Sequence, residues 1–182
     1  MGFPWPLNDK VVAFVESLGG LFWHDTPYYI IPPTGGSPIY ATYIPDPATK
    51  VLVIGLTFGD VLEYDPVTDT FGAEVRSPKI GVWHGTRGEM MWHWDPALKS
   101  ILKTNPYPQL LWCDVSKPYE LLIVNDTDIT VWMDVTFWVV KFPKRVMCPV
   151  LNRYCDPEEL WNIYMKGIVV DYVRKGIGGE GA

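Results

Sequence analysis

The stretch that decides the fold is NDTDITVWMDVTFWVV, residues 125–140, a polar tetrapeptide followed by a run of alternating character. Every second residue from Ile129 to Val139 is apolar, which is the period of a β-strand with one face in a core. The opposite row carries Thr130, Asp134 and Thr136, as a solvent-facing row should. Trp132 and Trp138 belong to that same polar row, so the sequence raises the question of what covers them.

This strand is expected to run over residues 129–142, far beyond the usual five or six residues, and to span roughly 46 Å. Its two tryptophans are then on one face, about 20 Å apart. Leaving two indoles in water forgoes several kcal/mol of burial, at about 25 cal/mol per Å². We therefore expect the two tryptophans to be covered by the C-terminal helix, by the N-terminal arm or by another subunit.

The rest of the chain favours short elements, because 17 prolines and 16 glycines interrupt it. Strands are predicted over 21–33 with a break at Pro27, over 39–44 and 51–66, once or twice within 71–84, and over 109–115 and 119–124. Helices are predicted over 8–19, 95–103 and from 157 to about 165, whereas 167–174 suits a helix and a strand equally. The pattern predicts a mainly β fold, an antiparallel β-sandwich of jelly-roll-like type with two or three short peripheral helices.

The chain of 182 residues is expected to form a single β-sandwich domain over 1–182, with an N-terminal arm at 1–7 and a flexible C-terminal tail at 176–182. Hydrophobic residues make up 48% and charged residues 20%, as in folded globular proteins. The aromatic share of 14% is more than a core of this size needs. Aromatic side chains are therefore expected at a contact surface.

Charge and hydropathy exclude several function classes. The formal net charge is −6, and the basic residues cluster only as Lys144-Arg145 and Arg174-Lys175, which disfavours nucleic-acid binding. No apolar run approaches the roughly 20 residues of a transmembrane helix. The N-terminus lacks a basic region and has Glu16 in its apolar stretch, so no cleaved secretory signal is expected.

The three cysteines, Cys113, Cys148 and Cys155, are an odd number without paired spacing. A bridge between Cys148 and Cys155 stays open, although free thiols in a reducing compartment are the preferred interpretation. A structural zinc site is not indicated, because the chain has no C-x-x-C motif. No cofactor is expected.

The segment around His84 and His93 is the best candidate for catalysis. With His24 and Glu89 these histidines offer imidazole and carboxylate groups, which are ordinary metal ligands. Their spacing matches no metal-binding motif, and the chain has no nucleophile motif of the G-x-S-x-G type. A small metal-dependent enzyme is therefore one alternative, against hydrogen-bonded histidines among aromatic residues.

A carbohydrate-binding module is another alternative. Trp83, Trp92 and Trp94 crowd one segment, and Tyr28 lies in a second aromatic segment. Aromatic rings stack on sugar rings, but Trp and Tyr are also enriched in cores and subunit interfaces.

The leading hypothesis is a non-enzymatic structural subunit of a symmetric multi-subunit assembly. Its concrete form is a virion protein, capsid-associated, an adaptor or a spike base, with a cytoplasmic location as the alternative. The expected partners are protein subunits, as a homo-oligomer or with other structural proteins. The interface residues we expect are Phe3, Trp5, Trp132, Trp138 and Trp161.

Overall fold

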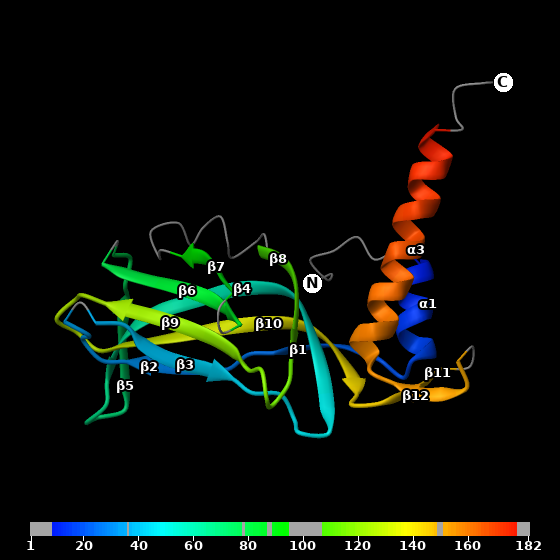
Figure 1. Ribbon diagram of the computed structural model, residues 1–182. Helices are drawn as coiled ribbons and strands as arrows, with labels where there is room; N and C mark the ends of the chain where they lie inside the picture. The colour runs from blue at the N-terminus through cyan, green and yellow to red at the C-terminus, as the bar shows by residue number, and fades with distance from the viewer. Residues whose placement is uncertain are drawn as a thin grey trace.

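The computed structural model describes residues 9–35, 37–77, 79–86, 89–94, 107–148 and 151–177, with the backbone alone for 89–94, 107–109 and 168–177. The described chain is mainly β, its sheets are antiparallel, and it has two helices (Figure 1). The predicted mainly β class is thereby confirmed.

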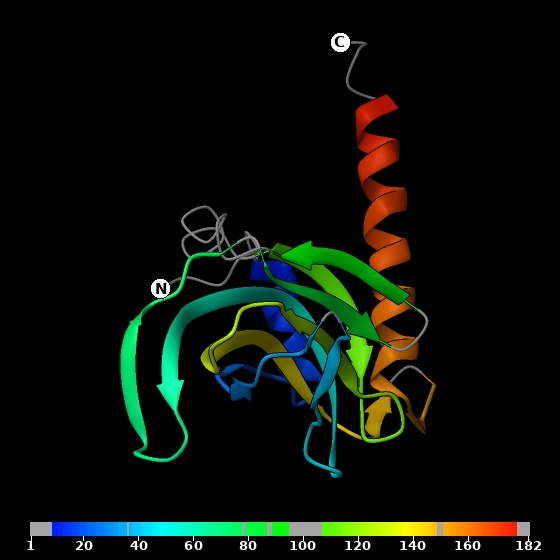
Figure 2. The ribbon, with the colours of Figure 1, turned by 90° about the vertical axis from the view of Figure 1, so that its left-hand side faces the viewer.

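Two long strands form the centre of a six-stranded sheet. They are β4, Thr49–Asp65, and β10, Val131–Pro143, and they pair along nearly the whole of β10. Each outer edge is shared by two shorter strands that cover different halves of the long one. Beside β10 these are β1 (Leu21–Asp25) and β2 (Tyr28–Ile31), and beside β4 they are β8 (Tyr107–Cys113) and β5 (Thr70–Glu74). The sheet is strongly curled (Figure 2).

A four-stranded sheet lies against the inner face of this curled sheet. Its order is β3 (Ile39–Tyr43), β9 (Tyr119–Asn125), β6 (Ile80–Thr86) and β7 (Glu89–Trp94). A separate hairpin of β11 (Val146–Cys148) and β12 (Arg153–Cys155) follows the end of β10.

The inner core lies between the two sheets, as the alternation in β10 predicts. The β10 residues that face it run from Val131 to Val139 in steps of two, and all are buried. Phe137 is central: its ring stacks on Tyr43 at 4.4 Å and meets the edge of Tyr119 at 5.2 Å. Since Tyr43 and Tyr119 belong to the other sheet, this aromatic trio joins the two layers.

A second core lies on the outer face of the six-stranded sheet, under the helices α1, Asp9–Ser17, and α3, Pro157–Ile177. Trp138, Val140 and Phe142 of β10 face this outer core. The two helices pack together through Phe14 and Tyr164, whose rings stack at 3.9 Å. The outer face of β10 is thus covered along its second half.

The start of α3 at Pro157 confirms the helix predicted from residue 157, and Asp156 caps it. Asp156 Oδ1 accepts the N–H of Glu158 at 2.8 Å, which satisfies one of the free donors at the start of α3. Lys50 of β4 bridges the Asp156 and Glu158 carboxylates at 2.8 and 2.7 Å and fixes the helix start to the sheet.

Helix α3 extends beyond its predicted end near residue 165. The ambiguous segment 167–174 is helical, and so are residues 176 and 177 of the expected flexible tail, which corrects the prediction for those two residues. A capped helix can propagate through Gly167 at a penalty of about 1 kcal/mol, and Arg174 and Lys175 suit a helix C-terminus. The predicted arm at 1–7, the helix at 95–103 and residues 178–182 lie outside the described residues.

Candidate functional site

The two tryptophans of β10 have different surroundings. Trp138 is 7% exposed, lies in the outer core, and donates its indole N–H to Thr57 Oγ1 at 2.9 Å. Trp161 of α3 is equally buried in the same core. The prediction places Trp138 and Trp161 at an interface. The chain itself covers both, which corrects their predicted interface role. Phe3 and Trp5 lie outside the described residues, and their interface role stays a prediction.

Trp132, at the other end of β10, is only half-buried. Its ring lies 5.8 Å from Tyr28 at a small angle of 23°, and 5.6 Å from Phe71 at 88°. Phe71 in turn contacts Tyr64 at 5.4 Å. Tyr28 is 62% exposed and Phe71 55% exposed. We call these four residues, Tyr28, Tyr64, Phe71 and Trp132, the aromatic patch.

Strand register explains why the aromatic patch forms. Tyr28 pairs with Asp134, the next residue after Trp132 on the same face, so Tyr28 and Trp132 are diagonal neighbours. Tyr64 pairs directly with Phe71 across the β4–β5 hairpin. The aromatic patch therefore occupies the first half of the outer face of β10, which the helices leave open.

The β4–β5 hairpin makes the surroundings of the aromatic patch acidic. Residues 58–75 contain no lysine or arginine and five carboxylates, which are Asp60, Glu63, Asp65, Asp69 and Glu74. Asp69 accepts the hydroxyl of Tyr64 at 2.8 Å, so one carboxylate touches the aromatic patch directly. Glu74 and Trp132 both pair with Leu62, from its two sides, and so share one cross-strand row.

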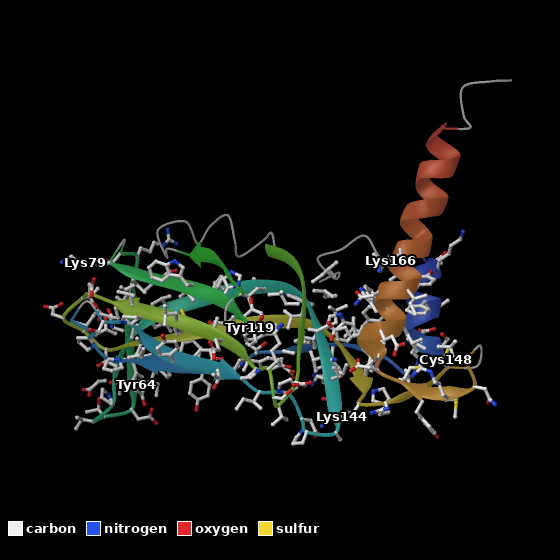
Figure 3. All side chains as sticks on the ribbon, viewed as in Figure 1. Tyr64, Lys79, Tyr119, Lys144, Cys148 and Lys166 are labelled. Atoms are coloured by element: carbon white, nitrogen blue, oxygen red, sulfur yellow. The ribbon has the colours of Figure 1, made fainter. Side chains whose placement is uncertain are left out.

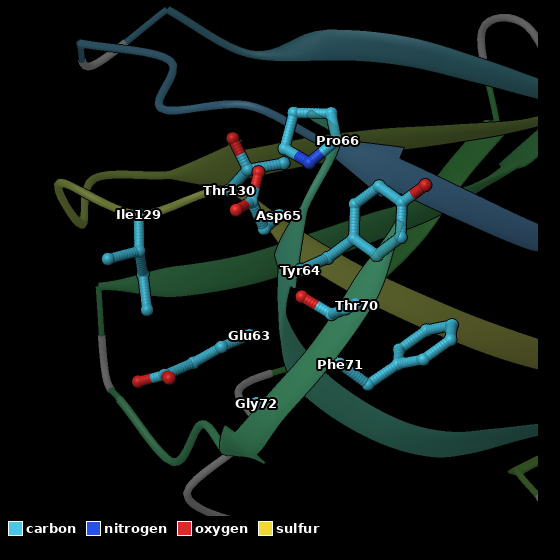
Figure 4. Close-up of a pocket in the computed structure, with 9 residues that line it drawn as sticks. All are labelled: Glu63, Tyr64, Asp65, Pro66, Thr70, Phe71, Gly72, Ile129 and Thr130. Carbon is cyan, nitrogen blue, oxygen red and sulfur yellow. The ribbon is translucent and has the colours of Figure 1, made fainter. Parts of the chain in front are cut away.

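A groove of about 410 Å³ lies at the end of this hairpin (Figure 4). It is lined by Glu63, Tyr64, Asp65, Pro66, Thr70, Phe71, Gly72, Ile129 and Thr130. Hydrogen bonds from the Val67 N–H and the Thr68 hydroxyl lower the pKa of Asp65, so this carboxylate is ionised at neutral pH. The groove thus offers fixed negative charge beside two aromatic rings.

The residues of the carbohydrate hypothesis are divided between the two sheets. Tyr28 is on β2 in the six-stranded sheet, and Trp83 is on β6 in the four-stranded sheet. Trp92 and Trp94 are on β7, where they pair with His84 and Val82. The backbone thus places Tyr28 in a different sheet from the three tryptophans, and the side chains of Trp92 and Trp94 lie outside the described part of the chain.

The residues of the metal hypothesis are divided in the same way. His24 is exposed on β1, whereas His84 is fully buried on β6 and bonds through Nδ1 to the hydroxyl of Tyr119. The β6–β7 register pairs His93 with Trp83 and Glu89 with Thr86. In the part of the chain with described side chains, no three His, Cys, Asp or Glu residues form a group that could hold a metal ion.

Burial of His84 predicts a pH-dependent stability. Desolvation lowers the pKa of His84 to about 3, against 6.5 in the unfolded chain, so the unfolded state binds the proton more tightly. The stability that the neutral form of His84 maintains is fully present above about pH 6.5, and it is lost as the pH falls towards 3. Urea denaturation should show a loss of roughly 1 kcal/mol between pH 7 and pH 5.5. His84→Gln should remove most of that loss, while His24→Gln should retain it; equal behaviour of both variants would contradict the assignment.

A polar network that the sequence did not reveal joins the two sheets. The hydroxyl of Tyr43 on β3 donates to the Asp25 carboxylate on β1, which Lys141 of β10 also contacts at 3.0 Å. Burial, followed by the Asp25 carboxylate, raises the pKa of Tyr43 above its usual range. The network neutralises a charge at the sheet edge, and we assign it to stability.

The cysteines give no indication of redox chemistry. Cys113, Cys148 and Cys155 are all buried and free, which agrees with the preferred interpretation of free thiols. Burial raises the pKa of Cys113 to about 12, so its thiol stays protonated and unreactive at neutral pH.

Comparisons with protein-family models, with curated proteins and with solved structures find no match to this chain. Over the described residues, neither helix has both the length and the apolar character that crossing a membrane requires.

Sequence reasoning selected Tyr28 and Trp132 but missed Tyr64 and Phe71. The signal was present, because the turn DPVTDT joins an alternating strand to a short one and makes Tyr64 and Phe71 cross-strand neighbours.

Proposed function

We propose that this chain is a non-enzymatic structural subunit of a symmetric multi-subunit assembly, and in concrete terms a virion component that binds other copies of itself or other structural proteins. The observation that carries the proposal is the aromatic patch, an open aromatic surface on the half of the outer sheet face that the two helices leave uncovered. Clusters of exposed aromatic residues mark interaction sites on soluble proteins.

A second apolar surface at the other end of the molecule supports the proposal. Met147, Leu151, Tyr154 and Ile163 are exposed around the β11–β12 hairpin and the first half of α3. An apolar groove of about 330 Å³ lies between α1 and α3, lined by Phe14, Ser17, Leu18, Cys148, Leu151, Leu160, Ile163 and Tyr164. A subunit with contact surfaces at two ends is suited to repeated assembly.

The projecting end of α3 adds to this second surface. Tyr164 bonds to the carbonyl of Lys10, near the first residue of α1, and the helix then continues to Ile177 past the end of its neighbour (Figures 1 and 2). The sequence of that part, GIVVDYV, is largely apolar. A helical segment of this composition gains stability by packing on a partner.

The arrangement of the two sheets favours a virion component among the possible assemblies. The six- and four-stranded sheets share one core, and we propose that they form a jelly-roll-like β-sandwich, an arrangement found in viral capsid domains. Fold alone does not define function, so the proposal depends on the contact surfaces.

The native mass tests the proposal. Sedimentation velocity over a concentration series should give species well above the 20.7 kDa monomer. Trp132→Ala should weaken association at least tenfold without a large change in melting temperature, since truncating a central aromatic residue commonly removes 2 kcal/mol or more of binding energy, about thirtyfold. Trp23→Ala is the control, because Trp23 is a tryptophan of the same sheet that is 48% exposed on β1 and lies outside the aromatic patch. A strictly monomeric protein at every concentration would overturn the proposal.

A further inference from the structure

The two ends of strand β10 carry complementary surfaces. Trp132, near its start, lies in the aromatic patch with acidic residues around it. Lys144 and Arg145, directly after its end, are exposed in the turn that leads into β11. Figure 3 shows Tyr64 of the aromatic patch and Lys144 at well-separated parts of the molecule. We call residues 144 and 145 the basic turn.

The basic turn has cations that this chain does not use. Neither Lys144 nor Arg145 makes a salt bridge or side-chain hydrogen bond to any described residue, in contrast to Lys50, Lys141 and Arg153, which are all paired with carboxylates. Next to the turn, Met147 and Tyr154 form an exposed cross-strand pair on the β11–β12 hairpin. The surface is therefore apolar and positively charged.

The aromatic patch offers the matching chemistry. Asp69 touches Tyr64, and Glu74 lies in the cross-strand row of Trp132. Arginine and lysine bind favourably to such sites, because aromatic faces attract cations and carboxylates pair with them. A negatively charged partner is disfavoured here, since residues 58–76 have five carboxylates against one cation, Arg76, which pairs with Glu74 at 3.3 Å in an exposed contact.

The two surfaces cannot meet within one chain. Twelve positions of one extended strand separate Trp132 from Lys144, which corresponds to roughly 40 Å. A contact between two identical faces would bring like charges together, either carboxylates at the aromatic patch or cations at the basic turn. The complementary contact is therefore heterologous, from one end of a copy to the other end of the next.

We infer that the aromatic patch of one copy binds the basic turn and the adjacent Met147–Tyr154 pair of a second copy, so that subunits associate head to tail. This inference rests on the proposed assembly function and names its contact. A heterologous contact forms a ring where the rotation between subunits closes and a filament where it does not.

Charge reversal tests the inference. Glu74→Lys and Arg145→Glu, each made alone, should weaken self-association at least tenfold in sedimentation velocity. The double variant with both changes in one chain should recover most of it, because the contact then pairs the same charges in reverse. Lys10→Glu is the control, with the same charge change as Arg145→Glu at the helix end of the molecule but away from the basic turn. Melting curves of each variant show that it is folded.

A mixing experiment tests the head-to-tail order. Trp132→Ala loses the aromatic patch, and Lys144→Ala combined with Arg145→Ala loses the basic turn, so each protein alone should be monomeric. Mixed, they should form a 1:1 dimer and nothing larger, since only one productive contact remains.

The outcomes separate the two proposals. Assembly that persists through both charge reversals, or a mixture that stays monomeric, overturns the head-to-tail contact and leaves the assembly function standing. A wild-type protein that is monomeric throughout overturns both and leaves the aromatic patch for a different kind of ligand, such as a glycan.

Discussion

Trp138→Ala is expected to lower the free energy of unfolding by about 3–5 kcal/mol, the usual range for removing a buried tryptophan. Trp138 lies in the outer core between the sheet and the two helices, so its loss leaves a cavity under α1 and α3. The indole hydrogen bond to Thr57 is lost as well. Urea denaturation followed by circular dichroism measures the effect.

Trp132→Ala is the matched control for this experiment. It removes the same side chain from the same face of the same strand, but at a half-buried position outside the outer core, so we expect a stability loss of about 1 kcal/mol. The stability loss of Trp138→Phe should lie between those of Trp132→Ala and Trp138→Ala, since phenylalanine retains a buried ring but loses the bond to Thr57. Equal losses for Trp132→Ala and Trp138→Ala would show that the helices do not cover Trp138.

Asn125→Ala is expected to lower the free energy of unfolding by about 3 kcal/mol, although the lost side chain is polar. The Asn125 side chain is fully buried and donates to the carbonyls of Ile31 at 3.1 Å and Ile129 at 2.9 Å. Its Oδ1 accepts the N–H and the hydroxyl of Thr127 at 3.2 and 2.6 Å. Each buried polar group that loses its partner costs about 1–3 kcal/mol. The same denaturation assay applies.

The turn itself offers the control for Asn125. Asp128→Ala changes an exposed residue of the same tetrapeptide and should alter stability by no more than about 0.5 kcal/mol. Asn125→Asp keeps the acceptor and loses both donations, so it should be nearly as destabilising as Asn125→Ala. A small effect of Asn125→Ala would contradict a role for this side chain in joining the ends of β2 and β9 to the start of β10.

Local sequence patterns predicted which face of a strand each side chain occupies, but not which segments cover that face. The period of two in β10 correctly assigned Phe137 to one face and both tryptophans to the other, because side-chain alternation is a property of the strand alone. What covers each tryptophan depends on α1 and α3, which come from opposite ends of the chain. No local signal distinguishes Trp132 from Trp138 in that respect.

Helix α3 shows the limit of residue propensity. The segment IVVDYV is rich in β-branched residues, which pack well in sheets, and this left its structure open. The capping residue Asp156 and its bridge to Lys50 fix the helix start more than ten residues earlier, and the helix continues from there. A strand at this position would also need a neighbouring strand, which the sequence could not exclude.

The candidate site was predictable only in part. Tyr28 and Trp132 were selected as aromatic residues in strands, and both belong to the aromatic patch. The histidines were grouped by residue type, yet the fold places His24 and His84 in different sheets. Grouping chemically similar residues predicts a site only where strand order is known, and strand order is set by long-range pairing.

The pairing of β4 with β10 has a mechanical consequence. In the head-to-tail assembly proposed above, each subunit is held at the start of β10 and again just after its end, so tension between neighbours runs along that strand. Because both attachment points lie at the ends of β10, and β10 is already extended, the load passes along one strand and does not pry it from β4. We therefore expect single-molecule pulling through residues 132 and 144 to show no unfolding step, because the chain between them is already close to its full reach.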